Sequence, residues 1–123
     1  MKKIIGASIL AASMIFCLSF AVNNEPGPVM EMVVYHIKPE EVANKEMILN
    51  SVNSELKNFT GFISRKVYHS TTDSTVFTDL CMWASLKDAN DAMKKMQDGH
   101  SCTKFLSSIT KVTVFDHFNA VEQ

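Results

Sequence analysis

The pattern of hydrophobic and polar residues after residue 28 predicts four β-strands. Residues 29–38, 62–70, 75–84 and 109–118 are short segments rich in β-branched and aromatic side chains, which is typical of strands. A polar turn over residues 71–74 separates the second segment from the third, so these two strands are expected to form a hairpin.

Two other segments have hydrophobic residues at the spacing of an amphipathic helix. Residues 39–57 begin with a proline and two glutamates, a combination that favours a helix start, and a stripe of aliphatic residues follows. Residues 86–98 come directly after Ser85, which together with Asp88 forms a capping box at the beginning of a helix. A short helix is expected over residues 101–108.

The order β-α-β-β-α-β predicts an α+β fold of the ferredoxin-like type, in which both helices cover one face of a four-stranded antiparallel sheet. Residues 29–118 form this single domain. Alternation along the third strand puts Phe77, Asp79, Cys81 and Trp83 on one face, which we assign to the uncovered side of the sheet. Because so much apolar surface is costly in water, we expect a homodimer whose two sheets pack face to face and enclose an apolar cavity.

The start of the chain has the pattern of an export signal. Two lysines precede the uncharged hydrophobic run of residues 4–20, and a small-x-small pattern ends at Ala21. This pattern predicts a signal peptide over residues 1–21 and a polar linker over residues 22–28. Lipidation at Cys17 and an uncleaved membrane anchor are the two alternatives. The protein is therefore expected to be exported, to the periplasm or beyond, and to be free of the membrane after cleavage.

Charge and cysteine content narrow the possible functions. The whole chain carries 12 basic and 13 acidic side chains, and the loss of a leader with two lysines makes the balance more acidic. Such a charge argues against nucleic-acid binding, which normally requires a basic surface. Cys81 and Cys102 remain after the leader, and they are expected to be buried thiols, with a disulfide as the alternative in an oxidising compartment.

Several residues of the predicted domain are similar to those of a known family. They are Gly61-Phe62 at the start of the second strand, Trp83-Ala84-Ser85 at the end of the third, and His100 followed by Phe105 near the short helix. In this respect the chain resembles the antibiotic biosynthesis monooxygenase-like domains of the dimeric α/β-barrel superfamily. The resemblance implies oxidation of a phenolic or quinol-like substrate by dioxygen, without metal or flavin. It also implies a flat aromatic ligand bound between the sheet and the elements that cover it.

In that family a tryptophan and an asparagine four residues before it stabilise the substrate anion. Trp83 matches the tryptophan, but Asp79 stands at the position of the asparagine. The resemblance therefore implies that Trp83 orients the ligand and that Asp79 serves as a base or a polarising group. The alternative is structural, with Trp83 in the core and Asp79 paired with Lys66 or Lys111 across the sheet. The alternative function is that of a non-catalytic binding protein or stress-related protein, whose barrel carries a small apolar molecule.

Other candidate site residues come from the faces of the predicted strands. Phe77 and Cys81 share the face of Asp79, and they are candidates for contact with the ligand. Tyr35, which shares a face of the first strand with Glu31, is a third candidate, with an edge-strand or solvent position as its alternative. His100 is a candidate acid–base group, with capping of the short helix as its alternative role.

The superfamily also has a branch that degrades haem with an axial histidine, an asparagine and a tryptophan. Val33 or Tyr35 stands where that asparagine is expected, and His100 precedes the short helix instead of lying within it, so haem degradation is disfavoured. The histidines have no short metal-ligand spacing, so a zinc site is not expected. The resemblance implies that no cofactor is needed. These histidines are His36, His69, His100 and His117.

Overall fold

A computed structural model describes residues 27–123 of the chain. The predicted signal peptide, Cys17 and all but the last two residues of the predicted linker lie outside the described residues. The four strands form one antiparallel sheet in the order β2-β3-β1-β4, which is the ferredoxin-like arrangement predicted from the sequence. The strands are β1 (Val29–Ile37), β2 (Phe62–His69), β3 (Val76–Trp83) and β4 (Ile109–Phe118).

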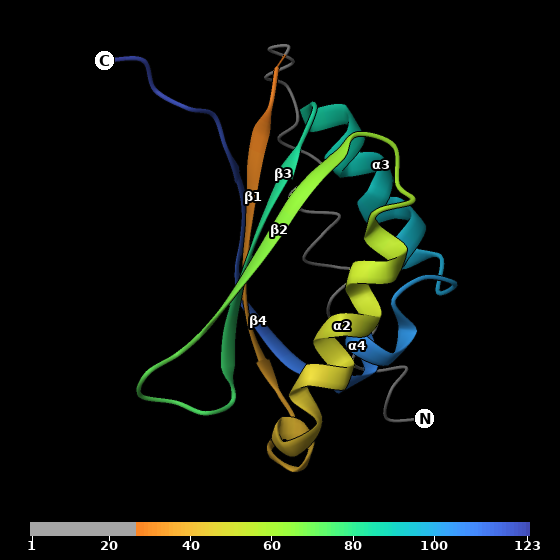
Figure 1. Cartoon of the computed structure of the whole chain (residues 1–123), viewed down its shortest axis with the longest axis vertical. Helices are drawn as coiled ribbons and strands as arrows, with labels where there is room; N and C mark the ends of the chain where they lie inside the picture. Colours follow the sequence, from red (N-terminus) through yellow and green to blue (C-terminus); the bar gives the residue numbers. More distant parts are fainter. Residues whose placement is uncertain (1–26) are drawn as a thin grey trace.

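The helices all lie on one side of the sheet (Figure 1). They are the 3₁₀-helix η1 (Pro39–Asn44) and the α-helices α2 (Lys45–Leu56), α3 (Leu86–Gln97) and α4 (Thr103–Ser108). The helix predicted over residues 39–57 is thus two segments, because Asn44 has φ −103° and ψ 15° and interrupts α-helical geometry between them. None of the helices within residues 27–123 is long and apolar enough to cross a membrane.

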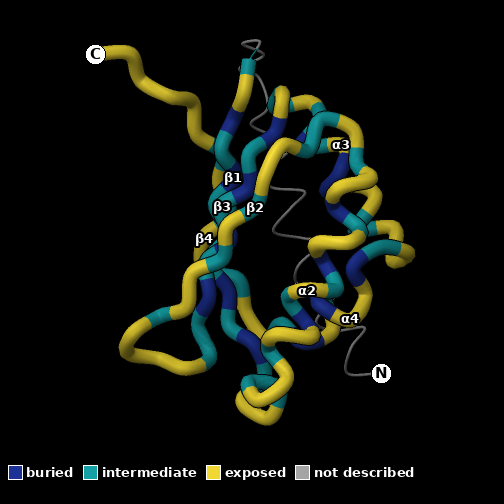
Figure 2. Tube along the Cα trace, viewed as in Figure 1, coloured by how far each residue is buried: buried dark blue, intermediate teal, exposed yellow. Residues whose placement is uncertain are grey.

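The sheet face that the helices cover, here called the inner face, carries the alternate residues of β3 from Phe77 to Trp83. These side chains are almost fully buried, and Trp83 is only 2% exposed. Our assignment of this face to the uncovered side was therefore wrong. Both faces of β3 are apolar, so alternation alone could not tell which face the helices cover. Buried segments of the strands and helices face one another across the core (Figure 2).

The other side of the sheet, here called the open face, is not covered by any helix within residues 27–123. Its side chains come from all four strands and alternate with those of the inner face. They are half-buried or exposed, although most are apolar. The apolar members are Met30, Met32, Val34, Tyr68, Val76, Leu80, Met82, Val114 and Phe118. An apolar open face thus exists as expected, but with different residues.

Gly61 holds the beginning of β2 against the beginning of α3. Its φ of 81° favours glycine, and a Cβ at this position would collide with the side chain of Asp88. The Gly61 carbonyl accepts a hydrogen bond from the Ala84 N–H at 2.7 Å. Ser85 caps α3 as predicted, since its hydroxyl accepts a hydrogen bond from the Asp88 N–H at 3.0 Å. These contacts fix the end of β3, and therefore Trp83, relative to the helix layer.

Candidate functional site

A cavity of about 50 Å³ lies between the inner face of the sheet and the helices. Strands β1 and β3 contribute its polar lining, together with Val33, Cys81 and Trp83. The polar side chains are Glu31 and Asp79. The helices and β4 contribute only apolar side chains, which are Val52, Leu56, Ala89, Ala92, Met93, Met96, Phe105, Leu106, Ile109, Val112 and Phe115. The site is therefore an apolar space with two carboxylates at one wall.

Trp83 contributes an unpaired hydrogen-bond donor to this cavity. Its ring packs edge-to-face against Phe62, with 5.5 Å between the ring centroids. Its indole Nε1 is buried and has no hydrogen-bond partner among the described residues. A buried donor left unpaired costs about 1–3 kcal/mol, so such groups usually have a function or a partner that binds later. The Trp83 N–H can donate to an acceptor that enters the cavity.

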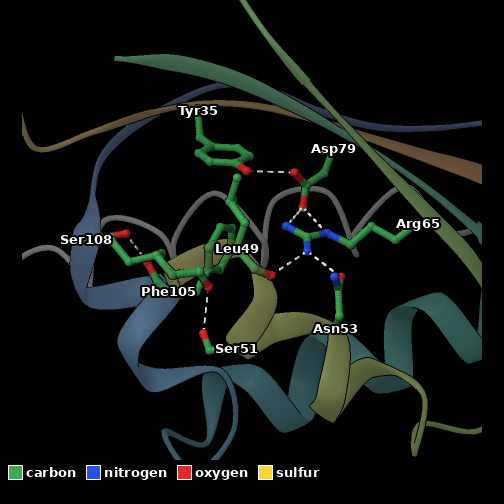
Figure 3. A network of polar contacts seen from close by, with 9 residues as sticks. Tyr35, Leu49, Ser51, Asn53, Arg65, Asp79, Phe105 and Ser108 are labelled. Atoms are coloured by element: carbon green, nitrogen blue, oxygen red, sulfur yellow. Dashed lines mark hydrogen bonds and ion pairs between the residues drawn. The ribbon is translucent and has the colours of Figure 1, made fainter. Parts of the chain in front are cut away.

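Both carboxylate oxygens of Asp79 are already engaged (Figure 3). The Tyr35 hydroxyl donates to Oδ1 at 2.6 Å, and the Arg65 Nε donates to Oδ2 at 2.8 Å. The Arg65 Nη2 also lies 2.8 Å from Oδ2, and the two side chains are only 2% and 8% exposed. Asp79 is thus one half of a buried ion pair.

Arg65 also connects the sheet to α2. Its Nη1 donates to the Leu49 carbonyl at 2.9 Å and to Asn53 Oδ1 at 2.7 Å (Figure 3). Although burial opposes the charged guanidinium, the neighbouring carboxylate of Asp79 raises the pKa of Arg65 above its ordinary value. The ion pair therefore holds its charges while it ties β2, β3 and α2 together.

The predicted pairing of Asp79 with Lys66 or Lys111 was wrong, because the partner is Arg65. A register shift between Phe62 and Ser64 turns the rest of β2 over, so that Arg65 faces inward beside Cys81. Simple alternation from Phe62 would place Lys66 on the inner face instead. The bulge is the reason that sequence reasoning missed this residue.

Tyr35 and Phe77 belong to the core and not to the cavity lining. Their rings stack with centroids 6.1 Å apart, and Tyr35 also packs edge-to-face against Phe105. Burial, together with the charge of Asp79, raises the pKa of Tyr35 far above its ordinary range, so its hydroxyl stays protonated and donates to Asp79. Of the three predicted ligand-contact residues, only Cys81 lines the cavity.

His100 is exposed and does not line the cavity. It does not cap the short helix either, because the N-cap of α4 is Cys102. Cys102 has φ 56°, and its N–H donates to both carboxylate oxygens of Glu55 at 3.0 Å. The structure therefore does not bring His100 together with Asp79 and Trp83, although the three were predicted to share a site.

The two cysteines of the described residues are free, buried thiols. Burial raises the pKa of Cys102 from 9.0 to about 11, and burial together with Glu31 raises the pKa of Cys81 well above its ordinary range. Both thiols are protonated at neutral pH. No group of three or more His, Cys, Asp or Glu side chains within residues 27–123 is arranged to hold a metal ion.

Sequence reasoning also missed the pairing of Glu31 with His117. Glu31 was noted only for sharing a strand face with Tyr35, and His117 was considered only as a metal ligand. The His117 Nε2 lies 2.9 Å from Glu31 Oε2, and the two side chains are 14% and 8% exposed. The register of β1 and β4 makes them direct cross-strand neighbours. The pairing could be found only from that register, since the residues are far apart in sequence.

Solved structures with this fold include proteins connected with oxygenase chemistry. A conserved protein from Methanosarcina mazei has a TM-score of 0.61 at 16% identity, covering 75% of this chain and 91% of its own. A candidate antibiotic biosynthesis monooxygenase from Bordetella bronchiseptica has a TM-score of 0.64 at 13% identity, covering 78% and 99%. SnoaB, a cofactor-independent oxygenase from Streptomyces nogalater, has a TM-score of 0.64 at 10% identity, covering 79% and 96%.

At such low identities these similarities define the fold. No protein-family model matches the sequence, and no curated protein matches it. The described residues form a ferredoxin-like α+β domain, which is the fold that the resemblance in the sequence implied. Function has to be argued from the site itself.

Proposed function

We propose that the protein binds a small phenolic or quinol-like molecule in the cavity and oxidises it with dioxygen, without a metal or flavin. The observation that carries this proposal is the buried, unpaired indole N–H of Trp83, a residue that lines an apolar cavity together with two carboxylates. A ligand oxygen is the natural acceptor for this donor. The fold shared with SnoaB supports the same chemistry.

The proposed reaction begins when the ligand loses a hydroxyl proton. The resulting anion is stabilised by the Trp83 N–H, whose effect is strong because the cavity is apolar and excludes most water. The electron-rich anion then reduces dioxygen. In the complete reaction one atom of dioxygen is added to the substrate. The other atom leaves as water with two hydrogen atoms that the substrate loses.

The size of the cavity favours a substrate with a single ring. Its volume of about 50 Å³ is small compared with the roughly 300–1,000 Å³ of pockets that hold drug-sized ligands. Met93, Met96 and Leu106 form part of the wall. Methionine side chains adapt easily to new shapes, so movement of this wall can enlarge the space for one aromatic ring.

Asp79 acts in this scheme as a fixed charge. Its two oxygens accept hydrogen bonds from Tyr35 and Arg65, so it is already occupied by its neighbours. Of the two roles considered for Asp79, base and polarising group, these contacts favour the second.

Oxygen consumption by the purified protein with small hydroquinones tests the proposal. Trp83→Phe keeps an aromatic ring but removes the N–H, and we expect the rate to fall by about 10²–10³-fold, as for the loss of one oxyanion-hole donor. Tyr68→Phe is the matched control, since it removes an aromatic hydroxyl on the open face and should leave the rate unchanged. An unchanged rate in Trp83→Phe would show that the proposed site is wrong.

A second candidate function is non-catalytic binding of a small apolar molecule. This function is favoured by the state of Asp79, which stands where the family that the sequence resembles has an asparagine. Both of its oxygens accept hydrogen bonds from neighbouring side chains, so neither is free for catalysis. Native mass spectrometry would then find a bound apolar molecule, while the purified protein consumes no oxygen with any quinol.

We also propose that a second copy of the chain covers the open face. The apolar side chains of this face span all four strands, and a surface of this kind is usually buried against a partner. Two such sheets packed face to face bury one another symmetrically.

The sequence pattern of residues 1–21 supports export as a further proposal. The mass of the protein recovered from its native compartment tests it. Cleavage after Ala21 gives a chain that starts at Val22, whereas an anchored protein retains the leader.

A further inference from the structure

The Glu31–His117 pair is the polar part of the site that the proposed reaction does not yet use. Glu31 lines the cavity and is only 6% exposed. Its carboxylate is paired with a histidine on β4, which is an edge strand of the sheet. A buried carboxylate normally needs a cationic partner, and histidine is a partner whose charge changes near neutral pH.

We propose that Glu31 takes the proton from the ligand hydroxyl and that His117 positions Glu31 and stabilises the accepted proton. This inference rests on the proposed binding of a phenolic ligand in the cavity. Glu31 is then a catalytic residue, because its carboxylate contacts the ligand, and His117 is a positioning residue that acts through Glu31.

The surroundings distinguish Glu31 from the other carboxylate of the cavity. Asp79 is bound by Arg65, whose charge is permanent, so its negative charge is already balanced. The groups that face Glu31 from the sheet are Cys81 on β3, beside Asp79, and His117 on β4. The side chains that α2, α3 and α4 contribute to the cavity are all apolar. Among the described residues, His117 is thus the basic side chain that contacts Glu31.

The position of His117 also gives the proton a way out. Its side chain is 14% exposed, against 8% for Glu31, and it lies on the edge strand. Its ring packs edge-to-face against Phe115, which lines the cavity, with 5.5 Å between centroids. The pair therefore extends from the cavity wall toward solvent, and a proton can leave without crossing the apolar space.

The proposed step is a simple proton transfer. The O–H bond of the ligand breaks, its electron pair stays on the ligand oxygen, and the proton bonds to the Glu31–His117 pair. The charge of the pair rises by one as the ligand becomes an anion. The Trp83 N–H then stabilises the new negative charge on the ligand oxygen.

Fluorescence of Trp83, the only tryptophan of the chain, allows this step to be tested without turnover. Phenol and anisole are titrated into the protein, since the two rings are alike but anisole has no proton to give. We expect the wild type to bind phenol about tenfold more tightly than anisole at mildly alkaline pH, which is the effect of one charge-assisted hydrogen bond.

Glu31→Gln should abolish the preference for phenol, while anisole binding stays as in the wild type and shows that the variant is folded. His117→Gln should weaken the preference for phenol without abolishing it, because Glu31 remains as the acceptor but loses the imidazole that contacts its carboxylate. The matched controls are Glu40→Gln and His100→Gln, both of exposed residues, which should behave as the wild type.

Two results would overturn the inference in different ways. If Glu31→Gln still prefers phenol about tenfold, Glu31 is not the proton acceptor, although the cavity remains the binding site. If neither phenol nor anisole changes the fluorescence of Trp83 in the wild type, the proposed function fails, and this inference fails with it.

Discussion

Replacing Arg65 by methionine should lower the free energy of unfolding by about 3–5 kcal/mol, the usual effect of removing one partner of a buried ion pair. The substitution leaves the Asp79 carboxylate buried with only the Tyr35 hydroxyl as a donor. It also removes both hydrogen bonds to α2. A loss of this size is a large part of the stability of a small domain. Urea denaturation followed by circular dichroism measures it.

Lys104→Met is the matched control, because Lys104 is exposed on α4, away from the open face. A change within about 0.5 kcal/mol is expected there. The double variant Arg65→Met/Asp79→Leu should recover part of the loss, since it removes the unpaired charge along with its partner. A loss below about 1 kcal/mol in Arg65→Met would mean that the ion pair is as weak as a solvent-exposed one, and the burial described for it would be wrong.

Leu80→Glu should convert a dimer into a monomer. Leu80 lies on the open face of β3, one of the two central strands of the sheet, and a partner sheet would remove the new carboxylate from water. We expect dimer affinity to fall by at least about a hundredfold, which corresponds to roughly 2.7 kcal/mol. Sedimentation velocity at micromolar concentration measures the change.

The control for this prediction is Met47→Glu. Met47 is an exposed hydrophobic residue on α2, on the side of the molecule away from the open face, so the variant should dimerise as the wild type does. A wild-type protein that sediments as a monomer would show that the open face has another partner or none.

The sequence was sufficient to predict the order of elements. Each predicted strand agrees with the structure to within one residue at either end, because polar turns, proline and glycine mark the ends clearly. The Ser85 cap was also predicted correctly, since a capping box is a local pattern. Local patterns of this kind need no knowledge of tertiary contacts.

The site was harder to predict because it depends on contacts between distant strands. Trp83, Asp79 and Cys81 were singled out correctly as neighbours on one face of β3, but the covered face could not be told from the open one. Arg65 reaches Asp79 only because of a bulge in β2, and His117 meets Glu31 only through the register of β4 with β1. Neither feature has a pattern in the sequence that alternation would detect.

The central claim is that a small phenolic molecule binds in the cavity beneath the helices and not on the open face. An NMR titration with phenol tests it most directly, using the single indole N–H of Trp83 together with labelled methionine methyl groups. Met93 and Met96 report on the cavity, whereas Met30 and Met82 report on the open face. We expect the indole resonance and the two cavity methyl groups to shift together and saturate. Shifts confined to Met30 and Met82, with the indole resonance unmoved, would contradict the account.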